Sequence, residues 1–195
     1  MKPYFDVNHV AFVLLLIVNI GWGAMELATT SYTREGATRI GGGGRRFTVL
    51  PAVIAAIAMI WVAPRIAPAA AIRPGAAAFT IGIVIMVGGL VLRGWSIKVL
   101  GDCFTRRVMV SGDQPVVTAG PYRLLRHPSY TGALLACAGY GLASANWVGF
   151  SAMVVLPLAA ILWRIHTEEE ALTATLGDRY QAYAAQHKRL VPLVW

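Results

Sequence analysis

The chain has 195 residues, with 17 Lys and Arg against 9 Asp and Glu, and a formal net charge of +8. Hydrophobic residues make up 57% of it and charged residues 13%, whereas a soluble domain is typically about 45–50% apolar and about 25% charged. So few charges cannot cover a water-soluble surface, and so high an apolar content excludes a disordered chain. The composition predicts a protein whose main solvent is lipid.

Four long segments contain no Asp, Glu, Lys or Arg: 7–25, 47–64, 74–92 and 127–163. The last, as one helix, would extend about 55 Å, well beyond the roughly 30 Å of a bilayer core. It is interrupted by Ser144-Ala145-Asn146, so we expect a helical hairpin there. Backbone polar groups cannot go unpaired in lipid, which requires helices. We therefore predict an all-α integral membrane bundle of five transmembrane helices, at about 7–28, 47–68, 75–98, 129–145 and 147–165.

Basic residues are distributed unevenly over the two sides of these spans. The loops after the first and third spans and the C-terminal end carry most of them, while the opposite side has Lys2, Arg65 and Arg73. By the positive-inside rule, we expect a multi-pass protein of the inner or plasma membrane, with its N-terminus outside and its C-terminus in the cytoplasm. The same topology, together with anionic lipid headgroups, explains the positive charge without nucleic acid as a partner.

The two parts of the chain differ in character. Residues 1–92 read as a scaffold of three spans, with a glycine loop at 41–44, whereas residues 93–195 carry nearly all the polar chemistry. In the second part, charged segments flank the hairpin and must meet at its cytoplasmic mouth, and an amphipathic segment follows. Ionisable groups within spans are functional candidates by default; Glu26 and Arg93 either reach to the interface or line the site.

Several familiar motifs are absent or misplaced. Gly139-Tyr140-Gly141 partly matches a dinucleotide-binding pattern, but it lies inside an apolar span, where small residues favour close helix packing. The sequence contains no phosphate-binding Gly-Lys-Ser/Thr loop and no serine nucleophile elbow. Its four His residues are scattered without zinc-ligand spacing, so we predict no metal site.

One constellation surrounds the hairpin. Residues 120–132 read Gly-Pro-Tyr-Arg-Leu-Leu-Arg-His-Pro-Ser-Tyr-Thr-Gly, and Glu168-Glu169-Glu170 follows about forty residues later. Gly177, Tyr180, Tyr183, Arg189 and Pro192 complete the pattern. Over roughly residues 101–195 the chain resembles the isoprenylcysteine carboxyl methyltransferase family, whose signature combines Arg-His-Pro-x-Tyr-x-Gly with a later Glu-Glu pair.

The resemblance implies a membrane enzyme that uses S-adenosylmethionine and releases S-adenosylhomocysteine, with a cytoplasmic C-terminal cap that binds the cofactor. Arg164 would bind the substrate, and Arg164 and Glu168 would be the catalytic residues. The family's cofactor contacts fall on Gln114, Pro115, Val116, Val117, Tyr122, His127, Pro128, Ser129, Tyr130 and Glu168.

The implied chemistry suits these residue types. A carboxylate acceptor is ionised at pH 7, with a pKa near 3.5, so methyl transfer to it needs no general base; positioning and removal of water remain. Arg164 would orient the acceptor carboxylate through two parallel hydrogen bonds. Simpler interpretations stay open: Arg164 and Glu168 have the i, i+4 spacing of a plain helix salt bridge, and Arg126-His127-Pro128 is also typical of a helix start.

We therefore predict S-adenosylmethionine-dependent methyl transfer to a lipophilic membrane substrate, first of all the carboxylate of a prenylated cysteine or a similar lipid acid. A phospholipid amine or small thiol methyltransferase is the alternative within this class. Outside it stand an NADPH-dependent membrane reductase and a non-enzymatic scaffold or transporter, although the sequence lacks the inverted repeats that are typical of transporters.

Overall fold

The computed structural model describes residues 4–29, 38–39, 49–101, 109–110 and 115–192. Its helices are α1 (Tyr4–Val7), α2 (His9–Ala28), α3 (Leu50–Ile66), α4 (Gly75–Leu100), α5 (Pro128–Ala143), α6 (Trp147–Leu176) and α7 (Asp178–Gln186), with short 3-10 turns η2 (Pro68–Ala70) and η4 (Gly120–Arg123). Two strands of two residues each, β1 (Thr38–Arg39) and β2 (Met109–Val110), pair antiparallel. The part of the chain described here is thus almost entirely helical, as predicted.

Helices occupy all five predicted places, and three of them are long apolar helices. α2, α4 and α6 are long and apolar enough to cross a membrane, and α3 is a shorter apolar helix of 17 residues. α5 has 16 residues. The all-helical membrane bundle is therefore confirmed, and the number of five crossings stays a prediction.

α6 continues well beyond the predicted end of its span at residue 165. Its 30 residues correspond to about 45 Å at 1.5 Å per residue, which exceeds the thickness of a bilayer core. The residues after 165 include Glu, Ala and Leu, all good helix formers, so the charges mark the exit from lipid rather than the end of the helix. The helix stops at Gly177, whose φ of 55° is a conformation that glycine adopts readily.

The predicted hairpin turn is confirmed at residues 144–146. Ala145 has a positive φ of 53°, and the Asn146 side chain caps α6 by accepting hydrogen bonds from the backbone N–H groups of Val148 (3.0 Å) and Gly149 (3.2 Å). The Asn146 amide also donates to the carbonyl of Ala67 (3.2 Å). A capping asparagine satisfies N–H groups that have no partner inside the helix. Asn146 therefore marks where the turn ends and α6 begins.

α4 and α5 pack closely through glycines, which have no side chain to hold the two backbones apart. A Cβ on Gly82 would lie 2.5 Å from the backbone nitrogen of Ala143, and one on Gly89 would lie 2.5 Å from that of Ala136. Gly139 faces the backbone of α4 equally closely. Small residues that allow this backbone approach are a usual basis of helix association in membranes. Gly139 thus packs against α4, and Gly141 packs against Phe150 and Met153 of α6.

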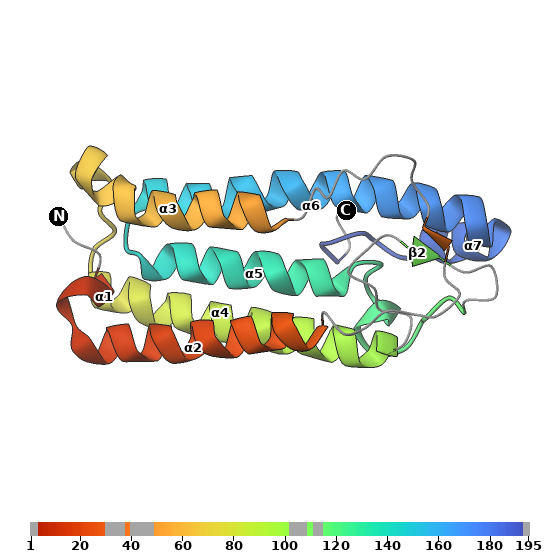
Figure 1. The fold of residues 1–195 in the computed structure, drawn as a ribbon, viewed down its shortest axis with the longest axis horizontal. Helices are drawn as coiled ribbons and strands as arrows, with labels where there is room; N and C mark the ends of the chain where they lie inside the picture. The colour runs from red at the N-terminus through yellow and green to blue at the C-terminus, as the bar shows by residue number, and fades with distance from the viewer. Residues whose placement is uncertain (1–3, 30–37, 40–48, 102–108, 111–114, 193–195) are drawn as a thin grey trace.

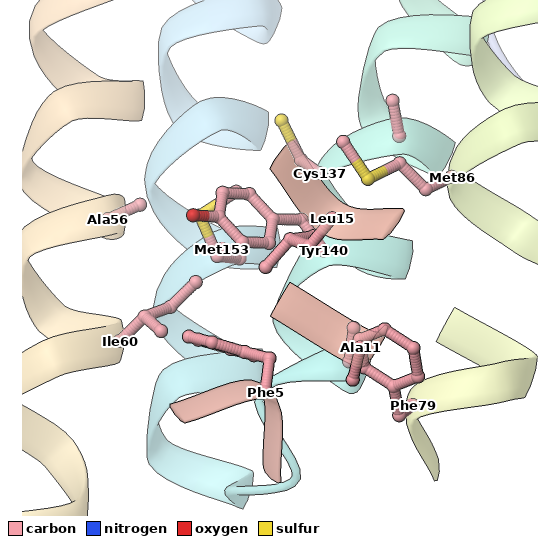
Figure 2. Packing of buried hydrophobic residues seen from close by; sticks show 12 residues of the cluster. Phe5, Ala11, Leu15, Ala56, Ile60, Phe79, Met86, Cys137, Tyr140 and Met153 are labelled. Carbon is pink, nitrogen blue, oxygen red and sulfur yellow. The ribbon is translucent and has the colours of Figure 1, made fainter. Parts of the chain in front are cut away.

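The apolar core lies in the half of the bundle away from α7. Phe5, Leu15, Ile60, Met86 and Met153 meet there from α1, α2, α3, α4 and α6 (Figure 2). Large apolar side chains also cover the outside of the helices, among them Val10, Ile17, Ile20, Leu27, Ile54, Val84, Val91 and Val155. Such an exterior is typical of helices that face lipid.

The helices lie side by side along one axis, and the two ends of the bundle differ (Figure 1). α1, η2 and the α5–α6 turn lie at one end, while η4, β2 and α7 gather at the other. The predicted boundary between scaffold and catalytic region at residues 92/93 falls inside α4, which continues to Leu100. α4 therefore links the apolar part of the bundle directly to its polar end.

Candidate active site

The polar end of the bundle is built by the two ends of the α5–α6 hairpin. α5 begins there with Pro128 at its first helical position, where the fixed φ of proline suits a helix start. α6 returns antiparallel and brings its charged C-terminal part, residues 164–176, to the same end (Figure 1). The first turn of α5 thereby meets the segment that carries Arg164 and Glu168.

The Tyr130 hydroxyl lies between Arg164 and Glu168. It donates a hydrogen bond to Glu168 Oε2 at 2.6 Å and accepts one from Arg164 Nε at 2.6 Å. The Arg164 guanidinium carbon also lies 5.8 Å from the centre of the Tyr130 ring, within the range of a cation–π contact. Three predicted site residues therefore form one connected group.

Arg164 and Glu168 have the i, i+4 spacing of a helix salt bridge, but in the structure both side chains contact Tyr130. The spacing puts both side chains on one face of α6, and that face is turned towards the first turn of α5, where Tyr130 contacts both residues. A hydrogen bond to a charged group is shorter and stronger than a neutral one. Tyr130 therefore fixes the orientation of both charged side chains.

Glu169, the neighbour of Glu168, forms a second and separate cluster. Its carboxylate accepts hydrogen bonds from His127 Nε2 (3.1 Å) and Arg189 Nε (2.9 Å) and forms ion pairs with Arg126 Nη1 and Arg189 Nη2, both at 2.8 Å. The residue is 8% exposed. Since a carboxylate only accepts hydrogen bonds, Nε2 of His127 carries a proton.

The environment of Glu169 keeps it charged. The residue lies beyond the apolar part of α6, which ends at Trp163. Burial opposes its ionisation, but the hydrogen bonds from His127 and Arg189 and the charge of Arg126 outweigh that effect and lower its pKa to about 2. Glu169 is thus a fully ionised anchor that three cationic or proton-bearing groups share.

These groups fasten the segment after α7 onto the segment before α5. The backbone N–H groups of Arg126 and His127 donate to the carbonyls of Lys188 (2.7 Å) and Arg189 (3.1 Å). The Thr131 hydroxyl donates to the carbonyl of Leu190 at 2.8 Å. The C-terminal segment 187–190 therefore closes the polar end and holds the residues that lead into α5.

Two buried tyrosines, Tyr122 and Tyr183, lie at the segment that leads into α5. Tyr183 of α7 donates from its hydroxyl to the carbonyls of Tyr122 (2.8 Å) and Leu125 (3.2 Å). Burial, opposed by the charge of Arg126, raises the pKa of Tyr183 to about 12. Burial and the nearby carboxylate of Glu168 raise the pKa of the Tyr122 hydroxyl still further. Tyr122 is buried at the same end of the bundle, and its contact with a cofactor stays a prediction.

The remaining predicted contacts differ in their surroundings. Pro115 is exposed, while Val116 is half-buried and packs against the cluster of Ala171, Leu176, Tyr180 and Tyr183. Val117 is half-buried. Gln114 lies outside the described residues.

Comparisons with known proteins cover the same part of the chain. The sequence pattern of the isoprenylcysteine carboxyl methyltransferase (ICMT) family matches residues 81–174, a stretch that contains Tyr122, α5 and α6 as far as residue 174. Over this region, the chain is similar to the ICMT family.

Individual ICMT relatives match about half of the chain. Protein-S-isoprenylcysteine O-methyltransferase A of Arabidopsis thaliana is 32% identical over 115 residues, which cover 58% of this chain and 58% of the plant protein. Protein-S-isoprenylcysteine O-methyltransferase of Schizosaccharomyces pombe is 31% identical over 113 residues, or 54% of this chain and 46% of the yeast protein. The chain therefore matches somewhat more than half the length of its plant relative.

The fold has a solved counterpart. The structure of a eukaryotic intramembrane Ras methyltransferase, ICMT, superimposes with a TM-score of 0.64 and 24% sequence identity, covering 78% of this chain and 55% of that chain. The superposition extends well beyond the region that the family pattern matches. The integral membrane fold of the chain is therefore that of ICMT proteins.

Sequence reasoning missed the partners of Glu169 in this ICMT-like site. Arg126, Glu169 and Arg189 were recognised as parts of the motif but received no role. Neighbouring residues on a helix point about 100° apart, so a Glu-Glu pair must face two different groups. That geometry is the signal that separates Glu168, which faces Tyr130, from Glu169, which faces His127.

Proposed function

We propose that this protein transfers a methyl group from S-adenosylmethionine to the carboxylate of a prenylated cysteine or a similar lipid acid. The observation that carries the proposal is the Tyr130 hydroxyl, which joins Arg164 to Glu168. One side chain suited to an anionic acceptor and one suited to a cationic donor are thereby held side by side at the polar end of an apolar bundle. The names of the ICMT relatives support the same reaction.

The residues around Glu168 fit the methyl donor. S-adenosylmethionine carries a sulfonium cation, an amino group, a ribose and an adenine, and when bound it supplies an electrophilic methyl group. Glu168 offers a carboxylate for its amino or hydroxyl groups, and Tyr122 and Tyr130 offer aromatic faces for a cation or an adenine ring. Ser129 and the buried His127 shape the same segment.

Arg164 fits the acceptor. A guanidinium binds a carboxylate through two parallel N–H···O bonds and so fixes its plane. The carboxylate is already ionised at neutral pH, so the protein has no proton to remove. The role of Arg164 is therefore orientation of the attacking oxygen, and the role of the surrounding apolar helices is the exclusion of water.

The lipid character of the acceptor follows from the location of the site. Arg164 lies one residue after the exposed Trp163, at the point where α6 leaves its apolar part, so a substrate with a hydrocarbon tail can remain in the membrane while its polar end reaches the guanidinium. A guanidinium only donates hydrogen bonds and repels a protonated amine, so it does not bind an ammonium substrate. The neighbourhood of Arg164 thus favours an acid over an amine.

The orientation in the membrane is part of the proposal. The excess of Lys and Arg after the third span and near the C-terminus supports a site on the cytoplasmic side of the inner or plasma membrane. A water-soluble donor is available on that side. The N-terminus then lies outside.

The test combines binding with turnover. Calorimetry on the detergent-purified chain should detect binding of S-adenosylhomocysteine and none of NADPH; the reverse result would support a reductase, and no binding of either would refute the proposal. A methyl-transfer assay should then accept N-acetyl-S-farnesylcysteine and reject its carboxyl amide, lipid amines and small thiols. The Glu170→Gln variant is a matched control, because Glu170 pairs with the exposed His166 on the outside of the same helix.

A further inference from the structure

α2 is weakly held along most of its length. Its buried residues are Ala11 and Leu15, both in the half that lies away from the polar end. Beyond them, Ile17, Ile20 and Leu27 are exposed, Leu27 to 71%. Towards the active site, only the partly buried Val18 and Trp22 of α2 pack against the apolar core.

A half-buried ion pair also fastens this half of α2. Glu26 Oε1 lies 2.7 Å from Arg93 Nε on α4 and accepts a second hydrogen bond from Trp22 Nε1 at 3.3 Å. The Arg93 side chain is 12% exposed. Removing one partner of such a pair leaves an uncompensated charge in a poorly hydrated place, so neither residue is a simple surface charge.

The other side of the Arg93 guanidinium reaches the first turn of α5. Arg93 Nη1 donates to the Ser129 hydroxyl at 3.0 Å and to the Ser129 carbonyl at 3.2 Å. The backbones are in contact as well, because a Cβ on Gly132 would lie 2.7 Å from the Arg93 nitrogen. The backbone of Arg93 therefore lies against α5, and the planar fork of the guanidinium spans from Glu26 to Ser129.

We propose that Arg93 is a positioning residue for the methyl-donor site, which holds Ser129 in place and is itself oriented by Glu26. Ser129 immediately precedes Tyr130, whose hydroxyl joins Glu168 to Arg164, so the Glu26–Arg93 pair sets the first turn of α5 on which that group depends. The inference rests on the proposed function. It also gives a role to α2, which lies outside the residues that the ICMT pattern matches.

The test measures the dissociation constant of S-adenosylhomocysteine by calorimetry. In Arg93→Lys, a single ammonium can pair with Glu26 or contact Ser129 but cannot span both, so we expect the dissociation constant to rise about tenfold while the melting temperature changes little. Ser129→Ala should raise it by a smaller factor. Glu26→Gln should raise it at least threefold, because the neutral amide no longer orients Arg93; an unchanged value would contradict the link to α2.

The double variant Arg93→Lys/Ser129→Ala separates positioning from a merely structural role. If Arg93 acts through Ser129, the double variant should bind no more weakly than Arg93→Lys alone; multiplying effects would overturn the proposal. Arg65→Lys is the matched control, since Arg65 lies on α3 and donates to its own helix carbonyl at Trp61, and its affinity should equal that of the wild type.

The same measurements distinguish the two levels of failure. A wild-type chain that does not bind S-adenosylhomocysteine overturns the proposed function and the role of Arg93 together. A wild-type chain that binds it, with Arg93→Lys binding equally well, overturns the role of Arg93 alone. If Arg93→Lys does not fold, the cycle of Glu26→Gln with Ser129→Ala tests the same link: non-additive effects support it and additive effects refute it.

Discussion

The hydroxyl of Tyr130 lies 2.6 Å from Glu168 Oε2, although 38 residues separate the two in the sequence. The contact crosses from the first turn of α5 to the charged part of α6, and Arg164 joins it from one helical turn earlier on α6. The first turn of α5 and the charged part of α6 thereby contribute side chains to one hydrogen-bonded group. The neighbouring Glu169 cluster and the glycines that bring α5 against α4 support this group from two sides.

Removal of the Tyr130 hydroxyl tests the group directly. Tyr130→Phe keeps the ring but loses hydrogen bonds to two charged partners, each of which contributes about 1.5–3 kcal/mol. We expect kcat/KM for a farnesylcysteine acceptor to fall by about ten- to a hundredfold, with helical content unchanged by circular dichroism. Tyr140→Phe, which alters a buried tyrosine of the apolar core, should retain wild-type kcat/KM; equal losses in both variants would contradict the role of Tyr130.

Arg164 and Glu168 should have separable roles. Arg164→Ala should leave the affinity for S-adenosylhomocysteine within about twofold but abolish turnover of an acid acceptor, because only the acceptor needs the guanidinium. Glu168→Gln should weaken binding of S-adenosylhomocysteine by tenfold or more, since it removes the carboxylate. Calorimetry and a methyl-transfer assay check the two effects. If Arg164→Ala loses donor binding to the same extent as turnover, the division of roles is wrong.

The sequence predicted most of the fold for physical reasons that are visible residue by residue. The charge-free segments locate the helices because burying a charge in lipid is costly, and Asn146 marks the hairpin turn because its side chain caps α6. The Arg-His-Pro-x-Tyr and Glu-Glu motifs located Tyr130 and Glu168 correctly at one end. The extension of α6 to Leu176 differs from the predicted end at residue 165, because the charged residues there mark where the helix leaves the lipid and not where it ends.

Long-range polar contacts could not be predicted in the same way. Glu26 and Arg93 are 67 residues apart, and no periodicity in the sequence pairs a carboxylate on one apolar helix with a guanidinium on another. The partners of Glu169 on α6 come from two other segments, before α5 and after α7, so only the assembled bundle reveals them. The approach of Gly89 to α5 likewise depends on which faces of two uniformly apolar helices meet.

Glu169 should stabilise the polar end far more than its exposed neighbour. Loss of one partner from a buried ion pair costs about 3–5 kcal/mol, whereas an exposed pair is worth about 0–1 kcal/mol. Glu169→Gln should therefore lower the melting temperature clearly and expose residues 187–190 to limited proteolysis, because Arg126 and Arg189 lose their shared anion. Glu170→Gln should change neither. If residues 187–190 were equally resistant to proteolysis in both variants, Glu169 would not be the residue that holds this segment.

The lowered pKa of Glu169 makes the free energy of unfolding depend on pH, so that stability falls as the pH falls. Its pKa is about 2 in the folded chain, against an ordinary value of 4.5, so the unfolded chain binds more protons than the folded one between these values. Its contribution to stability is fully present above about pH 5 and is lost as the pH falls towards 2. Thermal melting from pH 6 to pH 3 should show this loss in the wild type and a smaller one in Glu169→Gln; parallel curves would show that another group is responsible.

Two adjacent glycines of α4 should respond oppositely to the same substitution. A Cβ on Gly89 would lie 2.5 Å from backbone atoms of α5, whereas one on Gly88 meets nothing within 4 Å. Gly89→Ala should cost about 1–3 kcal/mol, because overpacking forces the helices apart. Gly88→Ala should be neutral or slightly stabilising, because alanine is the better helix former by about 1 kcal/mol. Since Arg93 lies one turn beyond Gly89 and contacts Ser129, Gly89→Ala should also weaken binding of S-adenosylhomocysteine. Melting temperatures and calorimetry of the pair check both effects, and equal behaviour of the two variants would contradict the close α4–α5 contact.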